Sequence, residues 1–215
     1  MTAAASNREQ ATVRRRYRSR LREQQTEQTR RAVVDAARDL FVSNGWAATG
    51  MRDIAAVAGV ALETVYSHFS SKPGLLRAVA DAAVVGDDAA VPLAERAEFL
   101  AIGQGPRPAR IRAAARMLTA VQVRTAAVAK LLRQAAPADE EIAEMLQSTR
   151  ERQRVDVATA LALVIGRAPR KFERDGVWAL ASPEVYLLLV EESGWRPEQY
   201  ETWVAETLER VIPRS

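Results

Sequence analysis

The sequence contains no cysteine and only one histidine, His68. Without thiols the chain can form no disulfide, no thiolate metal site and no cysteine nucleophile. A single histidine leaves little for a histidine-based metal site or a catalytic triad, and no other compact set of nucleophile, base and orienting group is visible. We therefore expect a protein that is not an enzyme and that needs no metal or other cofactor.

Long apolar runs are also missing. No stretch approaches the roughly 18 uninterrupted apolar residues that a membrane-spanning helix needs, and the polar N-terminus has no signal-peptide core. Hydrophobic residues nevertheless make up 48% of the 215 residues, which is enough to bury a substantial core. We expect a folded, soluble, cytoplasmic protein with no membrane partner.

The positive charge is concentrated near the N-terminus. Residues 1–72 hold 12 Arg or Lys and 7 Asp or Glu, a balance of +5, whereas residues 73–215 hold 19 and 20, a balance of −1. A basic segment ahead of a neutral one is typical of a nucleic-acid-binding domain followed by a domain that does not bind nucleic acid.

Residues 1–25 are predicted to form a flexible Arg-rich arm, because they are polar and show almost no apolar periodicity. Such an arm is either a solvated tail or a segment that follows DNA phosphates or enters a minor groove. Its arginines are Arg14, Arg15, Arg16, Arg18, Arg20 and Arg22.

A first helix is predicted from Thr29 to Gly45, because apolar residues recur there at helical spacing and glycine can form the left-handed cap. Thr49 is the expected N-cap of a second helix at about 51–58. The apolar face of the first helix is Val33, Ala36, Ala37, Leu40 and Phe41.

Gly59 ends the second helix in a tight turn, and a third short helix follows. Two short helices joined in this way form a helix-turn-helix, here at about 50–69, within a DNA-binding domain of residues 26–72. Ser71 is the expected cap of a fourth helix that reaches about residue 85. The inward side of the third helix is Leu62, Val65 and Phe69.

Residues 73–215 are predicted to form a second, larger helical domain, since the chain shows no strand signal and no internal repeat. Loops are expected at 87–92 and 103–108. Helices are expected at about 109–135, 139–165, 182–194 and from Pro197 to before Pro213. The apolar stripe of the 109–135 helix is Ile111, Ala114, Leu118, Val121, Thr125, Val128 and Leu132.

Polar side chains on the third helix point away from its apolar face. Glu63, Thr64 and Tyr66 would face the major groove if this helix entered it, and Arg52 and Lys72 flank them. A lysine in the first turn of a helix is disfavoured by the helix dipole, so Lys72 indicates a bound anion, which a DNA phosphate would supply.

The run TGMRDIAAVAGVALETVYSHFSSKPGLL, Thr49–Leu76, resembles the TetR family of bacterial repressors. The preceding AARDLFVSNGW, Ala36–Trp46, is similar to the end of that family's first helix, so the resemblance covers about fifty residues. It implies an all-α homodimer with an N-terminal three-helix DNA-binding domain, followed by a larger helical ligand-binding and dimerisation domain. A small-molecule ligand would release the protein from its operator DNA.

The resemblance also assigns DNA contacts. It implies phosphate contacts for Thr49, Arg52, Tyr66, His68 and Lys72, and base-edge contacts for Leu62, Glu63 and Thr64. His68 and Tyr66 could instead be ordinary packed side chains.

Two features depart from the family pattern. Ala61 stands where the family often has a Ser or Thr that caps the recognition helix, which removes a cap worth about 1 kcal/mol. Pro73 and Gly74 replace the usual acidic first turn, so we expect the fourth helix to begin less firmly.

Polar residues on apolar faces of the second domain form a candidate ligand pocket. Buried polar groups need partners, so these residues are either paired within the protein or line a cavity. For each of these residues alone, pairing within the protein is the favoured interpretation. As a group, they indicate a pocket. The candidates are Met117, Gln122, Met145, Thr149, Gln153, Asp156 and Trp178.

The last two helices carry a large apolar load, which includes Leu187, Leu188, Leu189 and Val190. These four cannot all face one partner on a single helix, so a second subunit would supply the other side, as the resemblance implies. The predicted function is a ligand-released repressor. The alternatives are a DNA-binding factor that acts without a ligand, and an interaction module or enzyme localised by the basic domain.

Overall fold

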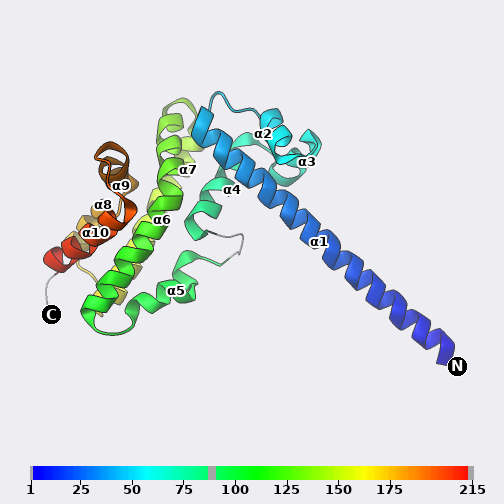
Figure 1. Cartoon of the computed structure of the whole chain (residues 1–215), viewed down its shortest axis with the longest axis horizontal. Helices are drawn as coiled ribbons and strands as arrows, with labels where there is room; N and C mark the ends of the chain where they lie inside the picture. Colours follow the sequence, from blue (N-terminus) through cyan, green and yellow to red (C-terminus); the bar gives the residue numbers. More distant parts are fainter. Residues whose placement is uncertain (1, 87–90, 213–215) are drawn as a thin grey trace.

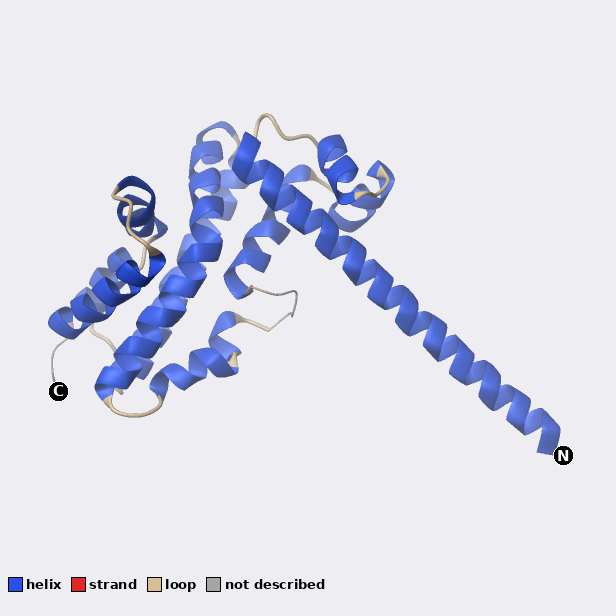
Figure 2. Ribbon diagram, in the orientation of Figure 1, coloured by secondary structure: helices blue, strands red, loops and turns tan. Residues whose placement is uncertain are grey.

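The computed structural model describes residues 2–86 and 91–212, with side chains from Leu21 onward except Val85. All regular elements in these ranges are helices, and none is a strand (Figures 1 and 2). The all-α prediction is therefore confirmed. In this part of the chain no helix combines the length and apolar character needed to cross a membrane.

Helix α1 (Thr2–Asn44) begins 27 residues before the predicted start at Thr29. Its N-terminal half projects from the rest of the chain as one continuous helix (Figure 1). The segment predicted as a flexible arm is thus helical, which corrects that expectation. The reason is composition: residues 1–44 contain no glycine or proline and are rich in Ala, Arg, Glu and Gln, all strong helix formers.

The predicted helix-turn-helix is confirmed as helices α2 (Met51–Ala58) and α3 (Leu62–Phe69), followed by α4 (Lys72–Val85). Gly59 has φ 68° and ends α2 in the left-handed conformation. The next amide closes the turn, since Val60 N donates to Ala55 O at 3.0 Å. We call helices α1–α4 the head and residues 91–212 the body.

The body contains two long helices and several short ones. Helices α6 (Arg107–Ala135) and α7 (Glu140–Ile165) run along each other, joined by the short turn η3 (Ala136–Ala138). Ahead of them lie η1 (Leu93–Glu95), α5 (Ala97–Leu100) and η2 (Ala101–Gly103), so α6 begins two residues before the predicted 109. Of the loop predicted at 87–92, residues 87–90 lie outside the described residues.

Three further helices complete the body. They are α8 (Lys171–Leu180), α9 (Pro183–Leu187) with the π-helical turn η4 (Leu188–Glu192), and α10 (Pro197–Val211). Ser182 caps α9, because its hydroxyl accepts from Val185 N at 3.4 Å. The helix predicted at 182–194 changes to wider π-helical bonding after Leu187 and ends near Gly194, whose φ is 72°.

Two hydrophobic cores hold the fold together. The first lies between the four head helices and the adjoining ends of α6 and α7, where Leu132 and Met145 are 1% and 0% exposed. The second lies between α6, α7, α9 and α10. Because residues of α4 pack in the first core, that core extends across the domain boundary predicted at 72/73. The head is thus packed directly on the body.

Candidate nucleic-acid interface and ligand cavity

The outward face of α3 carries the polar residues that the sequence indicated. Glu63 is exposed, Thr64 is half-buried and Tyr66 is 47% exposed. On the opposite face Val65 and Phe69 are in the first core at 0% and 7% exposed. α3 therefore presents one packed and one solvent-facing side, as a recognition helix must.

The residues around this face differ in their exposure and in the contacts that they make within the chain. Arg52 is exposed on α2 and forms no ion pair with a described residue. His68 is half-buried, with its ring centroid 6.0 Å from that of Phe69. Leu62 is half-buried and packs against the first core. Ala61, at the N-cap of α3, makes no side-chain cap bond, as the sequence predicted.

Thr49 is not the cap of α2, which corrects the expectation from sequence. The N-cap is Gly50, whose amide donates to the Asp53 carboxylate at 3.0 Å. Thr49 is 2% exposed, and its hydroxyl lies 2.9 Å from Gly45 O and 3.1 Å from Leu40 O. The side chain fixes the turn after α1, and its burial contradicts the implied phosphate contact.

Lys72 lies at the start of α4 and has a partner within the chain. Its Nζ donates to Trp46 O at 2.5 Å and lies 4.2 Å from the centroid of the Trp46 ring. Burial lowers the pKa of Lys72, and the nearby Asp139 carboxylate partly opposes this effect. A carbonyl and an aromatic face of the same chain therefore offset the unfavourable position of Lys72 in the first turn.

The first turn of α4 is capped and closely packed, whereas Pro73 and Gly74 were expected to weaken the start of this helix. Ser71 caps the helix as predicted, since its hydroxyl accepts from Gly74 N at 3.0 Å. A Cβ at position 74 would lie 2.6 Å from Phe69 O, so only glycine fits here. The residue that looked like a weakness allows α3 and α4 to approach closely.

A cavity of about 1010 Å³ lies between α4, α6 and α7. The middle of the predicted α6 stripe, Leu118 and Val121 among it, faces this cavity instead of a solid core. Exposed charged residues such as Asp81 and Arg152 also line it, so it reaches the surface beside α4 and α7.

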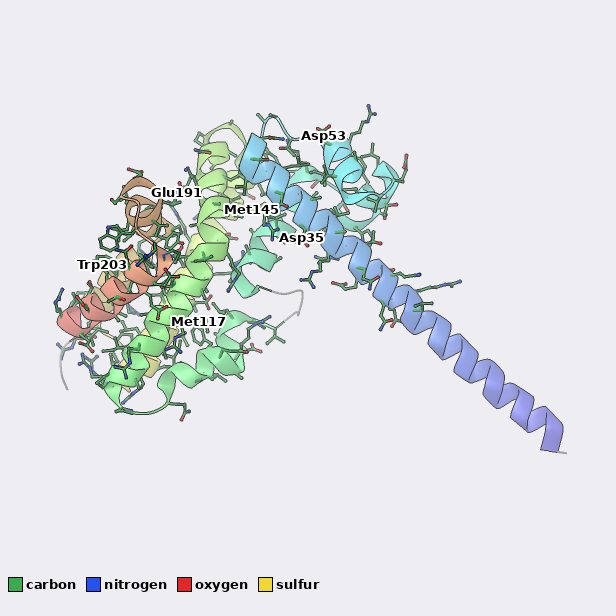
Figure 3. All side chains as sticks on the ribbon, viewed as in Figure 1. Asp35, Asp53, Met117, Met145, Glu191 and Trp203 are labelled. Carbon is green, nitrogen blue, oxygen red and sulfur yellow. The ribbon has the colours of Figure 1, made fainter. Side chains whose placement is uncertain are left out.

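Five of the seven predicted pocket residues line this cavity: Met117, Gln122, Thr149, Gln153 and Asp156. Met145 does not, because it is fully buried in the first core, whereas Met117 lies farther along the body (Figure 3). Trp178 also lies outside the lining, with the Arg154 guanidinium 4.2 Å from its ring centroid.

Two glutamines of the cavity wall bind the same backbone carbonyl. Gln122 Nε2 donates to Ala181 O at 2.6 Å, and Gln153 Nε2 donates to it at 3.0 Å. Gln122 is 1% exposed, and its Oε1 has no hydrogen-bond partner among the described residues. A buried acceptor without a donor is costly, so this atom is a candidate contact for a ligand.

Asp156 is a half-buried ionisable residue of the cavity wall. Burial raises its pKa, and the positive charge of Arg152 partly opposes that rise. Arg152 itself forms an ion pair with Asp81 on α4 at 3.2 Å.

Helix α4 is connected to the body by a residue that sequence reasoning missed. Arg124 on α6 donates to Ala83 O at 3.1 Å and to Val84 O at 3.0 Å, two carbonyls in the last turn of α4. None of these three residues lies in a recognisable motif, and the contact joins positions about forty residues apart in the sequence. Residues of α4 thus belong both to the first core and to the cavity wall.

Most apolar side chains of the last two helices pack within the chain. Leu187, Val204 and Leu208 are buried in the second core. Leu188 and Val211 stay exposed, at 52% and 54%. The predicted dimer contact thus has a smaller unpartnered surface than the sequence suggested.

Comparison with known proteins finds matches in the head and over the whole fold. Residues 33–79 match the model of the tetR family of bacterial regulatory proteins. The transcriptional regulator AlkX of Mycobacterium tuberculosis is 39% identical over 51 residues, 24% of each chain. The transcriptional repressor Rv3405c of the same organism is 46% identical over 55 residues, 26% of this chain and 29% of the relative. The matches therefore span only about a quarter of these relatives.

The fold likeness extends further than the sequence likeness. The crystal structure of a Rhodococcus sp. protein assigned to the TetR family of transcriptional regulators superposes with a TM-score of 0.65. The superposition covers 87% of this chain and all of the other, at 19% sequence identity. The likeness thus includes the fold of the body, at low sequence identity.

Proposed function

We propose that this chain, a member of the TetR family through its residues 33–79, is a DNA-binding transcriptional regulator that a small molecule releases from its operator. The observation that carries the proposal is the solvent-facing side of α3, which holds polar side chains over a packed core and lies beside the exposed Arg52.

The α3 face would read DNA in the major groove. Glu63 can accept from a cytosine amino group, and Thr64 can bond a base edge or contact a thymine methyl. Leu62 would contribute an apolar edge at the start of the helix. Because these residues lie in the first turn of α3, insertion of that end brings all three to the bases.

Phosphate contacts would come from the residues that flank this face. Arg52 is free to bind a phosphate, and Tyr66 has an exposed hydroxyl-bearing ring. His68 and Lys72 would add a second contact region at the end of α3 and the start of α4. Lys72 has further N–H groups beyond the one on Trp46 O.

Release by a ligand would act through α4. The helix supplies part of the cavity wall, while its other side packs in the first core. A ligand that displaces α4 therefore changes the position of α3 relative to the body, and it lowers DNA affinity only if it binds the displaced state more tightly.

A homodimer would place two heads on two half-sites of one operator. The exposed Leu188 and Val211, on η4 and α10, support the predicted contact through the last two helices.

The test begins with selection of bound fragments from genomic DNA, which yields an operator. Arg52→Ala should weaken binding to the operator and to random duplex alike, and should lower the magnitude of the salt slope by about 0.9. Thr64→Ala should instead change the preference for the operator over a mutated site.

Arg112→Ala is the matched control, because Arg112 is exposed on α6, far along the body from the head. It should leave affinity and salt slope unchanged. If Arg52→Ala and Thr64→Ala had the same effect on every duplex, the assignment of α3 as the recognition helix would fail.

A further inference from the structure

We propose that the cavity binds an apolar amine, whose N–H group donates to Gln122 Oε1 and whose positive charge lies beside Asp156. The effect of such a ligand on transcription rests on the proposed function, but its binding to the chain does not.

Gln122 indicates that the ligand is a hydrogen-bond donor. Its amide orientation is fixed by chemistry, because the group facing Ala181 O must be the donating nitrogen and a carbonyl only accepts. The oxygen is left buried in the cavity wall with no partner among the described residues. A ligand N–H at this oxygen would remove the desolvation cost of the unpaired acceptor.

Asp156 indicates that the donor is positively charged. Gln153 and Asp156 are three residues apart on α7, so they lie on one face of the helix, one turn from each other. Gln153 shares the Ala181 carbonyl with Gln122, which brings this face of α7 to the unpaired oxygen. No described side chain forms a hydrogen bond or ion pair with the Asp156 carboxylate, so a cation there would offset its burial.

The basic residues of the wall do not favour an anion. The cavity is lined by four acidic residues and by two arginines, Arg30 and Arg152. Arg152 is paired with Asp81, and the Arg30 guanidinium lies 5.4 Å from the centroid of the Phe69 ring. The acidic residues of the wall outnumber its arginines by two, so an acidic ligand would meet a wall of net negative charge.

The remaining wall requires an apolar skeleton. Apolar side chains such as Phe99, Leu118 and Leu161 line the same cavity. The hydroxyl of Thr125 donates to Val121 O of its own helix at 2.9 Å, so it offers no free proton to the cavity. A volume of about 1010 Å³ accommodates a molecule with one or two rings.

Matched naphthalene probes test the chemistry on the full chain without DNA, by isothermal titration calorimetry. The probes are 1-naphthalenemethylamine, 1-naphthalenemethanol, 1-naphthaleneacetic acid and the trimethylammonium analogue of the amine. We expect the amine to bind about tenfold more tightly than the alcohol, and the acid most weakly. The trimethylammonium compound keeps the charge but has no N–H, so it should bind about fivefold more weakly than the amine.

Three variants assign the two contacts. Asp156→Asn should reduce amine affinity about tenfold and leave the alcohol within about twofold. Gln122→Met removes the acceptor at similar volume and should weaken the amine and the alcohol by about fivefold each, but not the trimethylammonium compound. Gln134→Met, at an exposed position of α6, is the control and should change nothing.

The proposal is overturned if the acid binds as tightly as the amine, if no amine binds at millimolar concentration, or if the control lowers affinity as much as Gln122→Met. Its failure is distinct from failure of the proposed function. Amine binding that leaves the operator complex intact would refute release but keep the ligand chemistry, whereas loss of DNA binding in Arg52→Ala does not depend on any ligand.

Discussion

The head and the body differ in whether their buried polar side-chain atoms have hydrogen-bond partners. Among the described side chains of the head, every buried polar atom has a hydrogen-bond partner, and even Thr49 and Lys72 bond backbone carbonyls. The body contains all four exceptions: Arg110 Nε, Gln122 Oε1, Trp178 Nε1 and Tyr200 Oη. Proteins pair most buried polar groups, so the head is fully paired as it stands. In the body, the unpaired Gln122 Oε1 belongs to a residue that lines the cavity, whereas the other three atoms belong to residues outside the lining.

The same contrast holds for packing, and matched substitutions can test it. Leu76 is 0% exposed in the first core, whereas Leu118 lines the cavity. Leu76→Ala leaves a new void in a packed region and should lower the free energy of unfolding by about 2–5 kcal/mol. Leu118→Ala only enlarges an existing space, so we expect a loss nearer to about 1 kcal/mol.

Urea unfolding of both variants, followed by circular dichroism, measures the difference. Equal losses in the free energy of unfolding at the two positions would show that the cavity wall is packed as tightly as the head. That result would contradict the difference in packing between head and body. An apolar ligand in the cavity should also be lost more readily from Leu118→Ala than from Leu76→Ala.

Two helical glycines provide a second pair. Gly74 in the head would place a Cβ 2.6 Å from Phe69 O, whereas Gly176 on α8 has nothing within 4 Å. Gly74→Ala should therefore destabilise the protein by about 1–3 kcal/mol and weaken DNA binding, because α3 and α4 must separate. Gly176→Ala should stabilise it by about 0.5–1 kcal/mol through helix propensity.

Thermal unfolding distinguishes the two glycine variants by the sign of the change in Tm. A stabilising Gly74→Ala would contradict the close approach at the first turn of α4. A destabilising Gly176→Ala would mean that the surroundings of α8 are more crowded than the fold shows.

The head was predictable from sequence because its signals are local. Gly59 and Ser71 act within a few residues of their own position, and the apolar spacing of α3 defines its outward face. Thr49 was assigned wrongly, since a cap at Gly50 with Asp53 as its acceptor competes with it one residue away. Local chemistry thus gives the elements, with an error of one position at the cap of α2, but it missed the first 27 residues of α1, which show almost no apolar periodicity.

The cavity was only partly predictable, because periodicity shows that a face is apolar but not what it faces. Leu118 and Leu132 belong to one predicted stripe, yet the first lines a cavity and the second packs in a core. Met145 was a predicted pocket residue, but the start of α7, where it lies, packs against the head. The contact of Arg124 with α4 depends on how distant segments meet, which no local pattern encodes.

Two carboxylates of the body offer a finer test, because one is paired and the other is not. Glu173 is buried and accepts from Arg167 at 2.8 and 2.9 Å and from Arg170 N at 2.7 Å. The bond from the Arg167 guanidinium, helped by that from the Arg170 amide, lowers the pKa of Glu173 to about 2. Asp156 has no such partner, and burial raises its pKa.

The two shifts have opposite consequences for stability. The lowered pKa of Glu173 stabilises the fold above its ordinary pKa of 4.5, and this contribution is lost as the pH falls from 4.5 towards 2. The raised pKa of Asp156 means that ionisation disfavours the fold, so stability is lost as the pH rises from its ordinary pKa of 3.8 through the raised folded value.

We therefore expect the smallest effects from Glu173→Gln and Asp156→Asn, with opposite signs at pH 7 and without ligand. Glu173→Gln should be less stable than the parent chain, and its unfolding free energy should change less between pH 4.5 and 2. Asp156→Asn should be slightly more stable, because it removes an unpaired buried charge, while it weakens amine binding. Urea unfolding of both variants between pH 2 and pH 7 measures these effects. If both variants lost stability at pH 7, the Asp156 carboxylate would have a partner in the ligand-free protein, and the cavity would be as complete as the head.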